Sequence, residues 1–283
     1  MSDNRQRSPD RKFALIAPLA IGGAAIVVLV LVLTRPAPPP PAPEPPPPVV
    51  AAPPAKVAPA AVVSRADLIQ AAAKTADAYA SGAVAGGGDL VGRRFSVRLA
   101  FGCAGPVADP GPAQAYYQVD AKASSLKLVA RPSIWTDLPL VRAAPTPADT
   151  ETVEGFWIPR PWLTGDQCPK RREVAPPATP TPVEQPSLGL AVLHGQDAAR
   201  TERRGQRPYE HVLKLPPDSP AQGRVFELVL EGRISGFADG AAGHCWSESA
   251  EHRPVCLFAV DLDRVAFEDA DGSVLADWPR QSR

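Results

Sequence analysis

The sequence predicts an all-β region, folded as a sandwich or a barrel-like structure in one domain or two subdomains, behind a single N-terminal transmembrane helix. Three observations support this fold class. An uncharged apolar run occupies residues 13–34, prolines cluster in two segments, and hydrophobic residues alternate with a period of two after residue 89. A period of two is typical of half-buried β-strands.

The apolar run at residues 13–34 is long enough for a helix to cross the ~30 Å hydrocarbon core of a bilayer. Basic residues precede it, at Arg5, Arg7, Arg11 and Lys12. The positive-inside rule therefore places residues 1–12 in the cytoplasm and the remainder outside it. The alternative is a cleaved signal peptide, but the apolar core of such a peptide is usually ~7–15 residues long. We expect an uncleaved single-pass anchor in the bacterial inner membrane, with a periplasmic C-terminal region.

Residues 35–63 are rich in proline, alanine and valine. This composition favours the extended polyproline II helix, in which the stretch from 36 to 59 reaches at most about 75 Å. We interpret the segment as a semi-rigid spacer. The alternative is a docking strip for a proline-binding module.

A short helix is predicted at residues 64–82. Ser64 is a suitable N-cap, Asp67 lies in the first turn, and Gly82 marks the end of the helical spacing. We expect this helix to pack on the domain that follows, with self-association as the alternative.

The β region is predicted in two parts, residues 89–173 and 188–283, around a proline-rich break at residues 174–187. The break separates two subdomains, or it is a long surface loop within one β domain. The expected strands are 95–101, 116–119, 126–130, 153–158, 188–193, 209–215, 226–234 and 255–267.

Four cysteines, Cys103, Cys168, Cys245 and Cys256, lie beyond the predicted anchor. An even number of cysteines in an oxidising compartment indicates disulfide bonds, and the simplest pairing puts one bridge on each side of the break. The 30 basic and 30 acidic side chains are balanced and form no basic cluster, so nucleic acid is not an expected partner.

A zinc site is the alternative use of two of these cysteines. His244, Cys245, His252 and Cys256 offer two imidazoles and two thiolates, which suit tetrahedral zinc, although their spacing differs from the usual ligand pairs. We expect the disulfide instead, and no cofactor.

An enzymatic function has little support in the sequence. No Gly-x-Ser-x-Gly nucleophile elbow is present. His194 ends one predicted strand and His211 lies within another, so either histidine would suit a catalytic triad that sequence alone does not reveal.

The segment 156–162 concentrates two tryptophans, an arginine and two prolines. Tryptophan and arginine are enriched at binding hot spots, so Phe156, Trp157, Arg160 and Trp162 form the candidate interaction site. The alternative is a core tryptophan followed by a proline-stiffened loop.

The order of tail, anchor, spacer and exported β domain resembles in outline the inner-membrane components of envelope machines, such as TonB-type energy transducers and the anchoring subunits of secretion systems. The likeness is one of layout. The sequence therefore favours an anchored periplasmic protein that binds another envelope protein or component. The alternatives are an envelope hydrolase and a domain that binds a metal or a small molecule.

Overall fold

The computed structural model describes residues 61–83, 88–170, 186–216 and 222–280. The predicted anchor at residues 13–34 and nearly all of the predicted spacer lie outside these ranges. No helix within the described ranges is both long enough and apolar enough to span a bilayer. The described residues belong to one compact unit that begins at Ala58.

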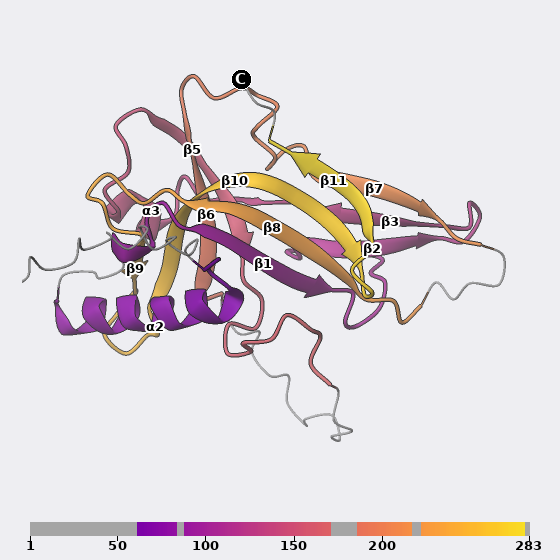
Figure 1. The fold of residues 1–283 in the computed structure, drawn as a ribbon, viewed down its shortest axis with the longest axis horizontal. Helices are drawn as coiled ribbons and strands as arrows, with labels where there is room; N and C mark the ends of the chain where they lie inside the picture. The colour runs from indigo at the N-terminus through magenta and orange to yellow at the C-terminus, as the bar shows by residue number, and fades with distance from the viewer. Residues whose placement is uncertain (1–60, 84–87, 171–185, 217–221, 281–283) are drawn as a thin grey trace, which may run out of the picture. The chain divides into compact units, whose positions relative to one another are not determined.

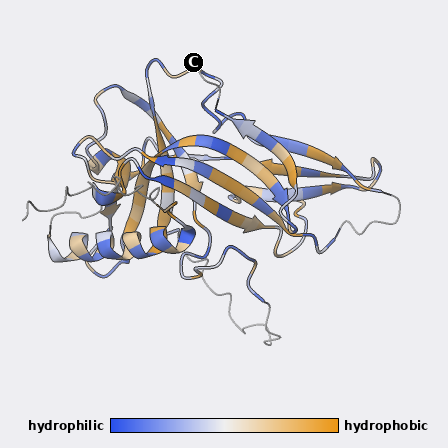
Figure 2. Ribbon diagram, viewed as in Figure 1, coloured by the Kyte–Doolittle hydropathy of each residue, from blue (hydrophilic) through white to orange (hydrophobic). Residues whose placement is uncertain are grey.

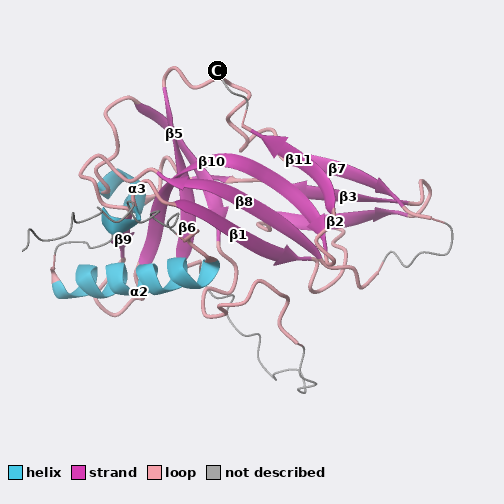
Figure 3. Ribbon diagram, viewed as in Figure 1, coloured by secondary structure: helices cyan, strands magenta, loops and turns pink. Residues whose placement is uncertain are grey.

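The described residues are mostly β-sheet (Figures 1 and 3). One α-helix and a short 3-10 turn, η1, precede the first strand, and a second α-helix lies between two strands. The helical elements are α2 (Arg65–Ser81), η1 (Gly88–Leu90) and α3 (Pro139–Ala143). The strands are β1 (Arg94–Phe101), β2 (Ala115–Asp120), β3 (Ser125–Ala130), β4 (Ser133–Ile134), β5 (Thr150–Trp157), β6 (Leu188–Gly195), β7 (Tyr209–Lys214), β8 (Phe226–Ile234), β9 (Gly243–Trp246), β10 (Val255–Asp269) and β11 (Val274–Pro279).

The larger sheet has eight strands, of which six run in the order β1-β8-β10-β6-β5-β4, while β9 and β11 pair with β10. Strand β1 pairs antiparallel with β8, and hydrophobic residues alternate with hydrophilic ones along both strands (Figure 2). Strand β10 is the longest strand, and its register shifts between Leu262 and Arg264. It pairs in parallel with β6 before this bulge and antiparallel with β11 after it.

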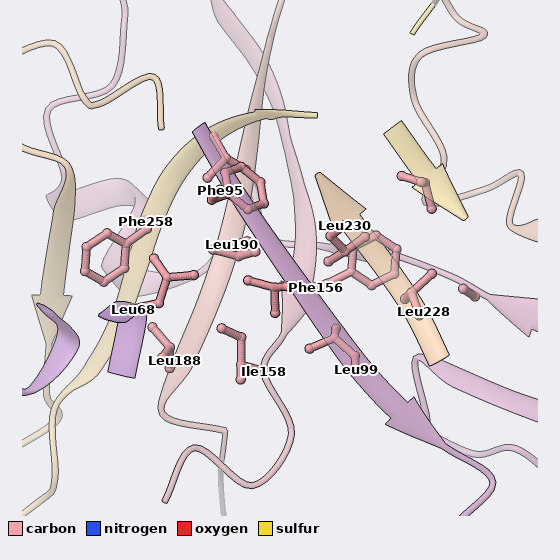
Figure 4. Close-up of a cluster of buried hydrophobic side chains, with 14 of the residues drawn as sticks. Leu68, Phe95, Leu99, Phe156, Ile158, Leu188, Leu190, Leu228, Leu230 and Phe258 are labelled. Carbon is pink, nitrogen blue, oxygen red and sulfur yellow. The ribbon is translucent and has the colours of Figure 1, made fainter. Parts of the chain in front are cut away.

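The smaller sheet has the order β2-β3-β7 and packs on the larger one in a sandwich-like arrangement. The hairpin predicted around residues 116–130 is present as β2 and β3. The rings of Tyr117, from the small sheet, and Phe226, from the large sheet, meet edge to face at 5.3 Å. One hydrophobic core contains side chains from both sheets, and Figure 4 shows part of it around Phe156 and Leu228.

Helix α2 begins and ends where the sequence predicts. Ser64 and Asp67 form a capping box, with the Ser64 backbone N–H donating to the Asp67 carboxylate at 2.8 Å. Gly82 ends the helix in the left-handed region with φ of 70°, which a residue without Cβ adopts readily. Leu68 and Ala72 are buried against the sheet, so the helix packs on the domain as expected.

Strands from both sides of residues 174–187 share the larger sheet. Strand β5 precedes this segment and β6 follows it, yet they pair along their length, with Trp157 opposite Gly189. Of the two interpretations of this segment, a break between two subdomains or a long loop within one β domain, the pairing of β5 with β6 fits the second. The strand list from the sequence lacks η1, α3, β4 and β9, which span two to five residues, too few for a clear periodicity. It also lacks β11, whose six residues do not alternate strictly between apolar and polar.

Candidate functional site

The candidate interaction segment divides into a buried part and an exposed part. Phe156 and Ile158 belong to the hydrophobic core, with 2 % and 1 % of their surface exposed. Trp157 is half-buried, and its ring centroid lies 4.4 Å from that of Trp135. Phe156 and Trp157 therefore stabilise the fold, as the second interpretation expected, and Phe156 has no surface to offer a partner.

Trp162 lies on the surface immediately after this buried part. It is 59 % exposed, the largest value among the large hydrophobic side chains of the described residues. Pro161 before it is buried, which fixes the position of the chain next to the tryptophan. We call residues 158–168 the Trp162 loop.

Arg65, in the first turn of α2, forms hydrogen bonds with the backbone of the Trp162 loop. Its side chain is almost fully buried, with 3 % exposed. Its Nε donates to the carbonyl oxygen of Leu163 at 2.8 Å, and its Nη2 donates to the carbonyl oxygens of Arg160, at 3.1 Å, and Pro159. One guanidinium thus satisfies three backbone acceptors, and the fixed fork of its N–H donors sets their relative positions.

Arg160 ties the same loop to the sheet. Its Nη2 donates to the carbonyl oxygen of Ala100 on β1 at 2.9 Å. Its backbone lies in the left-handed region, with φ of 52°, and its carbonyl accepts the N–H of Leu163 at 2.9 Å. Arg160 is therefore a structural residue of the turn that presents Trp162, rather than an exposed contact.

Burial shifts the pKa values of the ionisable groups behind the loop. It lowers the pKa of Arg65, an effect opposed by the charge of Asp166, and it lowers the pKa of Arg160. It raises the pKa of Asp166, against the influence of Arg65. Asp166 also has a buried carboxylate oxygen without a hydrogen-bond partner among the described residues. Three backbone carbonyl dipoles and the nearby Asp166 carboxylate thus stabilise the positive charge of Arg65.

A disulfide fixes the far end of the loop. Cys168 is bonded to Cys103, which follows β1. Arg65, Arg160 and this disulfide together hold the loop at three points along its length. Trp162 is therefore an exposed aromatic side chain on a constrained backbone.

The second disulfide joins neighbouring strands. Cys245 on β9 and Cys256 on β10 are register partners, and their sulfurs are bonded. The predicted disulfide bonds are present, and their pairing is the simplest of the three that the sequence left open. The zinc arrangement therefore lacks its two thiolates. The His244 Nε2 lies 3.0 Å from the Asp239 Oδ2, and the His252 Nδ1 lies 2.7 Å from the Ser249 hydroxyl oxygen. The described residues contain no group of three or more ligating side chains suited to a metal.

The sequence did not reveal the roles of Arg65 and Arg160. Arg65 carries no local signal beyond its place after an N-cap, because its acceptors lie more than ninety positions away in the chain. The two strand histidines occupy different environments: His194 is buried and His211 is half-buried.

Comparison with protein-family models, with curated proteins and with solved structures finds no match for this chain.

Proposed function

We propose that this chain is a protein of the bacterial inner membrane whose periplasmic β domain binds a protein of the cell envelope through the Trp162 loop. The observation that carries the proposal is an exposed tryptophan on a loop held by a buried arginine and a disulfide. Tryptophan is the side chain most enriched at binding hot spots. A fixed backbone lowers the conformational entropy lost on binding.

The sequence supports the location. The apolar run at residues 13–34 and its basic flank favour an anchor with an exported domain. The two disulfides fit an oxidising compartment. The proline-rich spacer would allow the domain to reach up to about 75 Å from the membrane, which suits a partner elsewhere in the envelope.

The test is crosslinking in intact cells, followed by pull-down of the full-length protein and mass spectrometry. We expect a defined envelope protein, lost when residues 89–283 are deleted. Trp162→Ala should reduce its recovery at least about tenfold, because a hot-spot side chain contributes about 2 kcal/mol or more.

Val212→Ala is the matched control, since Val212 is 54 % exposed on β7 and lies outside the loop. It should leave recovery unchanged. Equal recovery with Trp162→Ala and the wild type, at an intact fold, would contradict the proposal.

A further inference from the structure

A cavity of about 890 Å³ lies where two strands of the large sheet separate. Strand β6 pairs with β10 as far as Ala259, and β11 pairs with β10 from Arg264. Residues of β10 between these points, such as Asp261 and Leu262, line the cavity together with the end of β6. Its volume falls in the range of small-molecule sites. No residue of the Trp162 loop lines it.

Two buried polar side chains lie together in this cavity. Glu154 on β5 and His194 on β6 are 4 % and 7 % exposed, and the Glu154 Oε2 is 3.9 Å from the His194 Nε2. The Glu154 Oε2 accepts the backbone N–H groups of Arg204, at 2.6 Å, and Gly205, at 2.9 Å. These bonds fix the carboxylate and compensate part of its desolvation.

His194 is not hydrogen-bonded to its neighbour Glu154. The 3.9 Å between the His194 Nε2 and the Glu154 Oε2 is too long for a hydrogen bond. Burial lowers its pKa, against the influence of Glu154, so the ring is neutral at neutral pH. A neutral imidazole offers one donor and one acceptor, and a ligand in the cavity can use both.

Aromatic rings form the apolar wall of the cavity. Phe156, Tyr209 and Trp278 all line it, and the Tyr209 and Trp278 rings meet edge to face with centroids 5.2 Å apart. Phe156 and Tyr209 are almost fully buried, whereas Trp278 is half-buried and has free surface. Trp278 is therefore the ring on which an apolar face of a ligand can pack.

The charges of the cavity favour an uncharged ligand. Arg264 is already surrounded by carboxylates, at 2.9 Å from Asp277, 3.4 Å from Glu231 and 3.7 Å from Glu268. The lining contains carboxylates from five residues and guanidinium groups from three. A singly charged ligand would therefore meet groups of its own sign as well as groups of the opposite sign, whereas a neutral polar ligand can hydrogen-bond to either kind.

We propose that this cavity binds a neutral saccharide, with ring hydroxyls on His194 and Glu154 and an apolar ring face on Trp278. A hydroxyl group both donates and accepts, which matches a neutral imidazole beside an acceptor-only carboxylate. The C–H face of a sugar ring matches an aromatic wall. The cavity is separate from the Trp162 loop, so the saccharide proposal and the proposed function are tested independently.

The experiment is titration calorimetry of the full-length protein in non-ionic detergent. The probes are N-acetylglucosamine, its β-1,4-linked dimer, glucose and cellobiose, with glucose 6-phosphate and glucosamine as charged counterparts. At probe concentrations of about 10 mM, dissociation constants up to roughly that value are measurable. We expect at least one neutral saccharide to bind and the charged counterparts of glucose to bind at least tenfold more weakly than it.

Variants locate the site. His194→Ala and Trp278→Ala should each weaken binding at least tenfold, while His194→Gln, which keeps a donor and an acceptor, should retain more of it than His194→Ala. Trp162→Ala is the matched tryptophan control and should bind within twofold of the wild type. Circular dichroism confirms that each variant is folded.

Three results would overturn the proposal. The first is the absence of binding by every neutral saccharide to the folded wild-type protein. The second is binding that is unaffected by both His194→Ala and Trp278→Ala, and the third is stronger binding by a charged counterpart. Because the Trp162→Ala pull-down uses another surface, its outcome does not alter this one.

Discussion

Replacing Arg65 with methionine should release the Trp162 loop from the body of the domain. Methionine keeps most of the apolar volume but removes the donors to the carbonyl oxygens of Pro159, Arg160 and Leu163. These carbonyls are half-buried, so water replaces the lost donors only in part. A loss of about 1 kcal/mol for each gives about 3 kcal/mol in the free energy of unfolding. Relief of guanidinium desolvation offsets some of this, and the isolated Asp166 carboxyl adds to it.

The assay is urea-induced unfolding of the full-length protein, followed by circular dichroism. With urea m values of about 1–3 kcal/mol/M, a loss of 3 kcal/mol moves the midpoint by about 1–3 M. Hydrogen exchange should show faster exchange in residues 159–168, and binding of the proposed envelope partner should weaken because the tryptophan is no longer held in place.

Arg93→Met is the matched control. Arg93 donates one hydrogen bond, from Nη2 to the carbonyl oxygen of Ala61 at 2.7 Å, in an exposed position. We expect its removal to cost less than about 1 kcal/mol. If Arg65→Met costs no more than Arg93→Met, the three carbonyl contacts do not hold the loop and the reasoning is refuted.

Two further predictions concern packing and pH. Gly155→Ala should cost about 3 kcal/mol or more in urea unfolding, because a Cβ would lie 2.1 Å from the Leu190 carbonyl oxygen and 2.2 Å from the Trp135 ring. Gly165→Ala meets nothing within 4 Å and should stay within about 0.5 kcal/mol of the wild type; similar effects of the two would contradict the packing. For His194, burial depresses the folded-state pKa below the ordinary 6.5, so the unfolded chain binds more protons and stability falls as pH drops through 6.5 toward the folded pKa. The stability of the wild type relative to His194→Gln should therefore decline over that range, and a pH-independent difference between the two would show that His194 titrates normally.

The sequence predicted several elements that interactions between neighbouring residues decide. The capping box at Ser64 and Asp67, the alternation along β1 and the hairpin of β2 and β3 all follow from neighbouring residues. The sequence indicated disulfides but did not choose among the three possible pairings, and the structure has the simplest of them, with one bridge on each side of the break at residues 174–187.

The candidate sites depend on contacts between distant residues, and such contacts leave little local signal in the sequence. Composition singles out Trp162, but its exposure follows from the burial of two residues before it, Phe156 and Pro161, and from the turn between Arg160 and Leu163. The role of Arg65 depends on carbonyl groups, which carry no residue-specific signal. The partnership of Glu154 with His194 requires β5 and β6 to be neighbours across the break.

The length of the connection between β5 and β6 also favours the proposed binding role. These strands are antiparallel neighbours, and such neighbours can be joined by a turn of two residues. Here residues 158–187 join them, longer than the ~12–15 residues above which connections are uncommon and usually functional or linker segments. A mere linker would not need fixed points, yet its first part is bonded to Arg65, to the Ala100 carbonyl and, through Cys168, to Cys103. An extra length of chain that is fastened to the domain while exposing a tryptophan is better explained by recognition than by connection alone.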